Sequence, residues 1–218
     1  MLSLNFESTW TLGLIMKKTL AFILFHASFF VLAQEVGSFT DARDGNVYGF
    51  VTYTINLSDG TQSTLTWMSE NLKYNIENSR CYDNSQTNCE QYGRQYMYAE
   101  AINACPEGWH LPSDEEWYSL ANIYDGIPSA GQHLKSKSEL WGNGIGTNKS
   151  LFNAIPNQPV KAHKIKNMPQ PQPSAVFWSS TIKNAKYAWD WKLVAGWNKM
   201  QRWEGSKKEF NCVRCVKN

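Results

Sequence analysis

Five cysteines are the residues of this chain whose type and spacing most directly suggest chemistry. Cys81 and Cys89 bracket a polar loop with little apolar content to hold it in place, so a local Cys81–Cys89 disulfide would staple that loop. Cys105 needs a distant partner, and the candidates are Cys212 and Cys215 in the last segment. Because disulfides persist in exported proteins, the pattern predicts a disulfide-stabilised domain outside the cytoplasm.

Strand parity decides between the two candidate partners of Cys105. The last segment has the composition of a terminal strand, in which residues three apart point to opposite faces. Cys215 shares a face with Val213, whereas Cys212 shares one with Arg214, so Cys215 is the inward residue. We therefore expect a Cys105–Cys215 disulfide, with Cys212 left over.

The same parity argues against metal or redox chemistry at Cys212-Val213-Arg214-Cys215. A metal-binding or redox CxxC motif holds both sulfurs on one side of a turn or at a helix start. The sequence has no second CxxC and no His pair nearby. We expect no metal ion and no cofactor.

Other catalytic sets are incomplete. The region after residue 33 contains His110, His133 and His163 but no Gly-x-Ser-x-Gly motif that would place a serine nucleophile beside a base. His110, between Trp109 and Leu111, fits a hydrogen-bonded core histidine better than a catalytic base. The sequence therefore predicts a protein that is not an enzyme.

Three consecutive acidic residues, Asp114, Glu115 and Glu116, could supply the carboxylate pair of a glycoside hydrolase. They also place negative charge at the positive end of a helix dipole. Ser113 and Glu116 have the spacing of a capping box, in which each side chain bonds the other residue's backbone N–H. A role in starting a helix at Ser113 explains all three carboxylates.

Tryptophans crowd the last third of the chain, with amide and acidic residues between them. Flat aromatic faces beside such groups are suited to stacking on sugars. The alternative is that these tryptophans fill the core of a protein that has few aliphatic residues. The predicted ligand-binding residues are Trp189, Asp190, Trp191, Trp197, Asn198 and Trp203. The Glu-Pro-Asn and Gln-Pro-Asp motifs of calcium-dependent lectins are absent, so calcium-dependent sugar binding is not supported.

Two helices are expected around Pro106, which ends the first of them. The first helix would present an apolar face made of Tyr98, Ala101, Ile102 and Cys105. The second would begin at Ser113, end at Asp125-Gly126 and bury a face made of Trp117, Leu120, Ala121 and Tyr124.

Strands are expected on both sides of these helices. Residues 47–57 and 64–68 read as a hairpin, and Asp44-Gly45-Asn46 reads as a turn before it. The closing strands are residues 177–181, 187–194 and 211–216. The aromatic residues of the middle closing strand alternate with Asp and Lys, so they point to one face. Residues 142–148 read as loop, and residues 157–174 as a mobile loop inserted in the domain.

The N-terminal region predicts export. Met16-Lys17-Lys18 and the apolar run from Thr19 to Ala33 have the basic start, apolar middle and small-residue end of a signal peptide, residues 16–33, cleaved after Ala33. The run is shorter than the roughly 20 apolar residues that span a membrane. Residues 1–15 read as a mis-assigned upstream extension. We expect a secreted, cell-surface or periplasmic protein, with no membrane span after cleavage.

The composition limits the number of domains and the classes of partner. With 218 residues, 42% of them apolar, the chain can bury one good core. Its net charge of +2 and the lack of a long basic run argue against nucleic acid as the main partner.

A set of motifs carries a resemblance to a known family. The chain resembles the Fibrobacter succinogenes major paralogous (FISUMP) domain over residues 39–218, in the order and the wording of its motifs. These motifs are Arg43-Asp44-Gly45, Trp67-Met68-x-Glu70-Asn71-Leu72, Cys81-Tyr82-Asp83, Tyr92-Gly93-Arg94, Ala104-Cys105-Pro106-x-Gly108-Trp109-His110-Leu111-Pro112, Phe152-x-Ala154-x-Pro156, Trp178-Ser179-Ser180-Thr181 and Val213-Arg214-Cys215-Val216-Lys217.

The resemblance implies a fold more than an activity. The family is similar to the C-type-lectin-like fold, so we expect an α+β domain with two helices flanking a twisted antiparallel sheet, paired termini and long irregular loops. The expected function is an exported, non-catalytic lectin-like module that binds carbohydrate, as polysaccharide, or a cell-surface protein. The alternative is an extracytoplasmic enzyme similar to the formylglycine-generating type, whose Leu-Pro-Thr-x-x-Glu-Trp passage resembles the one from Leu111 to Trp117.

Overall fold

The computed structural model describes residues 34–56, 60–159 and 172–218, all within the unit Leu32–Asn218. The predicted signal peptide, its cleavage site and residues 1–15 lie outside the described residues. So do the tip of the first hairpin and, at residues 160–171, most of the predicted inserted loop, including His163.

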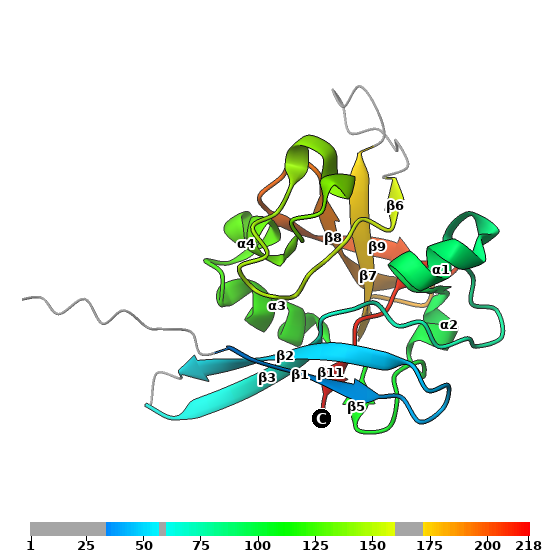
Figure 1. Cartoon of the computed structure of the whole chain (residues 1–218), viewed down its shortest axis with the longest axis horizontal. Helices are drawn as coiled ribbons and strands as arrows, with labels where there is room; N and C mark the ends of the chain where they lie inside the picture. Colours follow the sequence, from blue (N-terminus) through cyan, green and yellow to red (C-terminus); the bar gives the residue numbers. More distant parts are fainter. Residues whose placement is uncertain (1–33, 57–59, 160–171) are drawn as a thin grey trace, which may run out of the picture. The chain divides into compact units, whose positions relative to one another are not determined.

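The described chain is an α+β domain with two sheets (Figure 1). Sheet A consists, in spatial order, of β1 (Gln34–Thr40), β2 (Val47–Asn56), β3 (Gln62–Met68), β11 (Val216–Lys217) and β5 (Trp109–His110). Sheet B consists of β4 (Gln95–Tyr96), β10 (Asn211–Cys212), β7 (Pro173–Ile182), β8 (Tyr187–Val194) and β9 (Met200–Ser206), with β6 (Gln158–Pro159) paired to β7.

The two-sheet arrangement corrects the expectation of one antiparallel sheet with paired termini. β1 is an edge strand that pairs only with β2 among the described strands. β11 lies between β3 and β5, so the first and last strands share sheet A without touching each other. Sheet B is mixed, because β10 runs parallel to β7.

The strongest helix signal in the sequence is confirmed. α3 (Asp114–Asn122) begins with the Ser113 and Glu116 capping box, and its predicted apolar face is buried. It ends at Asn122, three residues before the predicted end, and Asp125 and Gly126 then turn the chain with positive φ angles of 62° and 77°.

The other helices differ from expectation. α2 (Tyr98–Ala101) is a single turn, so Cys105 is not on a helix face; a residue before proline avoids the α conformation, and the chain leaves the helix first. Helical turns also form where no helix was expected: η1 (Tyr82–Asn84), α1 (Gln86–Tyr92), α4 (Ile127–Leu134) and η2 (Glu139–Gly144), the last of which overlaps the predicted loop at residues 142–148.

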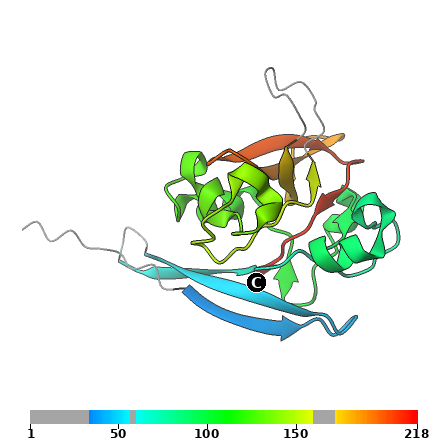
Figure 2. The same cartoon turned by 45° about the horizontal axis from the view of Figure 1, so that its top comes forward.

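Trp117 of α3 contacts residues of both sheets. Figure 2 shows the same cartoon from a second direction. The ring centroid of Trp117 lies 4.5 Å from that of Trp67 in sheet A, and 5.5 and 6.1 Å from those of Phe177 and Trp191 in sheet B. All four rings are buried. The aromatic residues therefore supply much of the core between the sheets.

Both expected disulfides are present, Cys81–Cys89 and Cys105–Cys215, and Cys212 is a buried free thiol. The argument that selected Cys215 was nevertheless partly wrong. The last segment is not one strand: β10 belongs to sheet B and β11 to sheet A, with residues 213–215 crossing between them. Cys212 and Arg214 are as buried as Cys215, so this segment has no outward face.

Arg214 is the centre of this crossing. Its Nε donates to Asn71 Oδ1 (2.6 Å), and its Nη atoms donate to the backbone carbonyls of Met68, Phe152 and Asn153. Burial lowers the pKa of Arg214 to about 9. The guanidinium thus links the end of β3, the loop at 152–153 and the C-terminal segment through hydrogen bonds to neutral groups. We call residues 213–215 with these partners and the Cys105–Cys215 bond the crossing.

Candidate functional site

The predicted ligand residues lie on and beside the antiparallel pair β8 and β9. In its register Trp191 faces Arg202, and Asp190 faces Trp203. Residues opposite each other share a sheet face, and neighbours along a strand alternate. Trp189 and Trp191 therefore lie on one face, and Trp203 lies on the other. The predicted tryptophans thus do not share one sheet face, which the sequence could not show because β9 was not recognised as a strand.

Trp191 and Asp190 are fully buried, so neither presents a surface to a ligand in this structure. Trp191 Nε1 donates to Asp114 Oδ1 (2.7 Å), and Arg202 Nε donates to Asp114 Oδ2. Asp114 is therefore more than a helix-start carboxylate: it fastens α3 to β8 and β9. The sequence suggested its capping role only.

Asp190 is a buried carboxylate with few partners. Its Oδ2 accepts from Asn211 Nδ2 (3.3 Å), and its Oδ1 lies 3.6 Å from Lys192 Nζ. A Cβ added to Gly205 would lie 2.5 Å from Asp190 Oδ2, which shows how closely β9 approaches. Desolvation raises the pKa of Asp190 to about 6, against the smaller effect of Lys192.

The Trp189 indole is half-buried, with two cationic side chains over its ring. The Arg202 guanidinium lies 3.2 Å from the centroid of its ring, and Lys183 Nζ lies 5.2 Å from it. Lys183 also forms an ion pair with Glu204, opposite Trp189 in the register. This arrangement covers one face of the indole.

Trp203 is the most accessible of the predicted tryptophans, with 51% of its surface exposed. It lies on β9, the edge strand of sheet B, with Lys192 Nζ 5.3 Å from its ring. Trp197 and Asn198 lie in the turn between β8 and β9; Trp197 is partly buried and Asn198 is exposed. Their carbonyls accept hydrogen bonds from Lys135 Nζ and Gln132 N.

A second candidate site, not predicted from the sequence, is an open pocket of about 440 Å³. Arg43, Asp44 and Asn46 of the β1–β2 turn form one wall, and Lys73, Tyr74 and Asn75 form another. Gln86, Cys89 and Glu90 of α1 and the nearby Arg94 complete it. Its lining comes from three separate stretches of sequence, so no local pattern could have revealed it.

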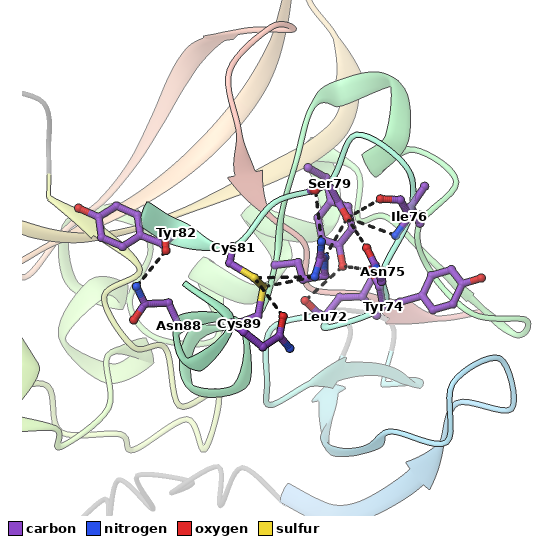
Figure 3. The surroundings of a disulfide bond; sticks show 12 residues. Leu72, Tyr74, Asn75, Ile76, Ser79, Cys81, Tyr82, Asn88 and Cys89 are labelled. Atoms are coloured by element: carbon purple, nitrogen blue, oxygen red, sulfur yellow. Dashed lines mark hydrogen bonds between the residues drawn. A yellow bond between two sulfur atoms is a disulfide. The ribbon is translucent and has the colours of Figure 1, made fainter. Parts of the chain in front are cut away.

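The pocket is largely polar and its first wall is ordered by hydrogen bonds. Asp41 binds Arg43 through both carboxylate oxygens, and the Arg43 guanidinium lies 3.8 Å above the Tyr74 ring. Asn46 donates to both oxygens of Asp44 through its backbone and side-chain nitrogens. The disulfide Cys81–Cys89 lies beside the stretch from Leu72 to Ser79 (Figure 3).

His110 is hydrogen-bonded as expected, but it is not a core residue. Its Nε2 lies 2.8 Å from Glu116 Oε1, its Nδ1 lies 2.6 Å from Asn218 Oδ1, and 41% of the side chain is exposed. Within residues 34–56, 60–159 and 172–218, no three His, Cys, Asp or Glu side chains are grouped to hold a metal ion. The same residues contain no helix long and apolar enough to span a bilayer.

Comparison with known proteins gives one match. The family model described as the Fibrobacter succinogenes major domain matches residues 61–217. No curated protein and no solved structure matches the chain.

Proposed function

We propose, from the premise that the chain belongs to the Fibrobacter succinogenes major domain family, that it is an exported, non-catalytic binding module for carbohydrate. The carbohydrate is a polysaccharide or the glycan of a cell-surface partner. We also propose that the domain is a distant variant of the C-type-lectin-like fold. Its α+β composition, its two disulfides and the return of the chain end to sheet A support that relation.

The observation that carries the proposal is the exposed indole of Trp203. Large aromatic side chains are usually buried, and one held half exposed on an edge strand presents a flat apolar surface to the solvent. Lys192 and Gln201, opposite each other on the same sheet face, supply polar groups beside it. An indole flanked by hydrogen-bonding side chains suits a pyranose ring, which has an apolar face and hydroxyl edges.

The cysteines favour a binding module over the enzyme alternative. A formylglycine-type oxidase needs reactive cysteines near a peptide cleft. Here Cys212 is the one free cysteine, and burial raises the pKa of its thiol to about 12. The disulfides also fit a protein that works in an oxidising compartment, which supports export.

The test is retention of the protein on insoluble polysaccharides, with Trp203→Ala compared with Tyr187→Ala. Tyr187 is 37% exposed and lies on the opposite face of the same strand pair, so it is a matched control. We expect Trp203→Ala to lose most of the retention and Tyr187→Ala to keep it. EDTA should have no effect, because the calcium-lectin motifs are absent. Equal retention of Trp203→Ala and the unchanged protein would show that Trp203 is not the binding surface.

A further inference from the structure

The Arg94 guanidinium is fixed against the disulfide Cys81–Cys89. Its Nη1 lies 3.5 Å from Cys89 Sγ and 3.8 Å from Cys81 Sγ. Ser79 holds it there, since Nε donates to Ser79 Oγ (2.8 Å) and Nη2 donates to the Ser79 carbonyl (3.2 Å). Figure 3 shows Ser79 on one side of the disulfide and Tyr82 on the other. The cation is thus anchored on both sulfurs.

No carboxylate of the described residues neutralises the charge of Arg94. Its guanidinium takes part in none of the ion pairs formed within the described ranges. The other guanidinium of the pocket, that of Arg43, is already bound by Asp41. A disulfide sulfur is a weak hydrogen-bond acceptor, whereas a thiolate is an anion that a neighbouring arginine stabilises. The contact therefore becomes stronger when the disulfide opens.

Cys89 also lines the pocket of about 440 Å³ described above. That volume is within the range of small-molecule sites, and the largely polar lining suits a hydrophilic compound. Only 3% of the Cys89 surface is exposed, so the pocket brings a small thiol beside Cys89, and attack on its sulfur requires the neighbouring side chains to move aside.

We propose that Cys81–Cys89 is a thiol-exchange site that reacts with an external thiol compound. The thiolate of that compound attacks Cys89 Sγ; a mixed disulfide forms, the Cys81–Cys89 bond breaks, and Cys81 leaves as a thiolate beside Arg94. A second external thiolate then attacks the external sulfur of the mixed disulfide and releases Cys89 as a thiolate. Two external thiols are oxidised to their disulfide, and the two electrons reduce Cys81–Cys89.

The other disulfide lacks these features. In that bond Cys215 is fully buried and Cys105 is half-buried, and the Arg43 guanidinium donates to the Cys105 carbonyl oxygen rather than to a sulfur. The Cys105–Cys215 bond also closes a loop of sequence separation 110, against 8 for Cys81–Cys89, so opening it costs the fold more stability. Exchange is therefore confined to Cys81–Cys89.

Opening this bond changes the pocket. Gln86, Cys89 and Glu90 of α1 line it, and the Cys81–Cys89 disulfide ties the middle of α1 to the residue before η1. Reduction frees that part of α1 and so alters one wall of the pocket. The concentration of reduced thiol around the protein then controls what the pocket can bind. This inference does not depend on Trp203, which lies on β9.

The experiment follows both disulfides of the folded protein during exposure to glutathione. Samples are quenched with acid, alkylated and mapped by peptide mass. We expect Cys81–Cys89 to open at least about tenfold faster than Cys105–Cys215, with a glutathione adduct on Cys89. Arg94→Gln should slow this opening several-fold and Arg94→Lys should restore part of the rate. Arg80→Gln is the control, because Arg80 is in the same region but stacks on Phe210 outside the pocket.

A second measurement separates electrostatics from loosening of the segment. In Cys81→Ser the Cys89 thiol is free, and the pH dependence of its alkylation reports its pKa. Arg94 faces this thiol, with Glu90 and Lys73 also lining the pocket. We expect a pKa below the usual value of about 8.5, which Arg94→Gln should raise and Arg80→Gln should leave unchanged. Simultaneous opening of the two disulfides, or a thiol pKa indifferent to Arg94, would overturn the proposal.

Discussion

Cys105–Cys215 and Cys81–Cys89 place the same covalent bond in two different settings. The first joins residues separated by 110 positions and lies in the crossing, beside buried Arg214. The second joins residues separated by 8 positions and lies beside an open pocket, against the partly exposed Arg94. In the chain-entropy relation the first should stabilise the fold by about 5 kcal/mol and the second by about 2.5 kcal/mol.

The difference shows that a disulfide's role depends on what surrounds it. At the crossing, a long-range bond and a guanidinium with neutral partners tie sheet A to the segment that leaves sheet B. At the pocket, a short bond holds a single short helix whose side chains form a surface. We therefore expect changes at the crossing to affect the whole fold, and changes at the pocket to act locally.

The largest effect is expected from removing the long disulfide. Cys105→Ala with Cys215→Ala should lower the free energy of unfolding by about 5 kcal/mol, because the unfolded chain regains a long open loop. Guanidinium denaturation of the double variant measures the loss. A loss no larger than that of the Cys81 and Cys89 double variant would contradict the comparison.

Arg214→Met tests the crossing without touching sulfur. It leaves the carbonyls of Met68, Phe152 and Asn153 and the Asn71 amide without their donor, so we expect a loss of about 3–5 kcal/mol. Arg214→Lys keeps the charge but not the planar fork, and should also be destabilised. Full stability of Arg214→Met in urea denaturation would mean that the apolar packing alone holds the crossing.

Asp190 tests sheet B next to the crossing, since it accepts a hydrogen bond from Asn211 of β10, the strand that precedes residues 213–215. Its folded-state pKa of about 6 exceeds its ordinary value of 3.8, so the folded protein binds the proton more tightly than the unfolded chain. Its contribution to stability is therefore fully present below about pH 4 and is lost as the pH rises to about 6. Asp190→Asn should remove this decline and gain on the order of 2–3 kcal/mol at pH 7.

Thermal or denaturant unfolding between pH 4 and 7 measures the difference between the Asp190→Asn variant and the unchanged protein. Lys183→Gln is a suitable control, because it alters an exposed ion pair that should contribute under about 1 kcal/mol. If the free energy of unfolding of Asp190→Asn still fell between pH 4 and 7 as in the unchanged protein, the fall would come from other titratable groups.

The smallest global effect is expected from Cys81→Ala with Cys89→Ala. The loss should be about 2.5 kcal/mol or less, with the increase in amide hydrogen exchange confined to the stretch from Tyr82 to Tyr92 and the pocket wall. Exchange that also increases in β3 or β11 would show that the pocket and the crossing are energetically coupled.

The parts of the fold that local chemistry specifies were predictable. The Ser113 and Glu116 capping box fixes the start of α3 within four residues, and the turn residues Asp44-Gly45-Asn46 fix the connection between β1 and β2. The family relation was also visible, because its motifs are stretches of contiguous sequence.

What depends on distant packing was not predictable. Arg214 looks like an outward strand residue until its neighbours in two sheets are known, and Trp203 looks like a partner of Trp189 until β9 is recognised. The pocket could not be predicted, because its lining comes from a turn near residue 44, a loop near residue 74 and helix α1. None of these stretches carries a sequence pattern that indicates a binding site. Two of the six predicted ligand residues proved fully buried for the same reason: aromatic and acidic types do not by themselves indicate exposure.

The place of β11 in the middle of sheet A has a consequence for biosynthesis. β3 and β5 are joined only through β11, which leaves the ribosome after every other described strand. Until then the facing edges of β3 and β5 carry unpaired backbone groups, which are open to strands of other chains. Such late closure by contacts distant in sequence slows folding. A chain that must stay unfolded for translocation would benefit from this delay, and a chaperone that covers β3 in the meantime would protect it from aggregation.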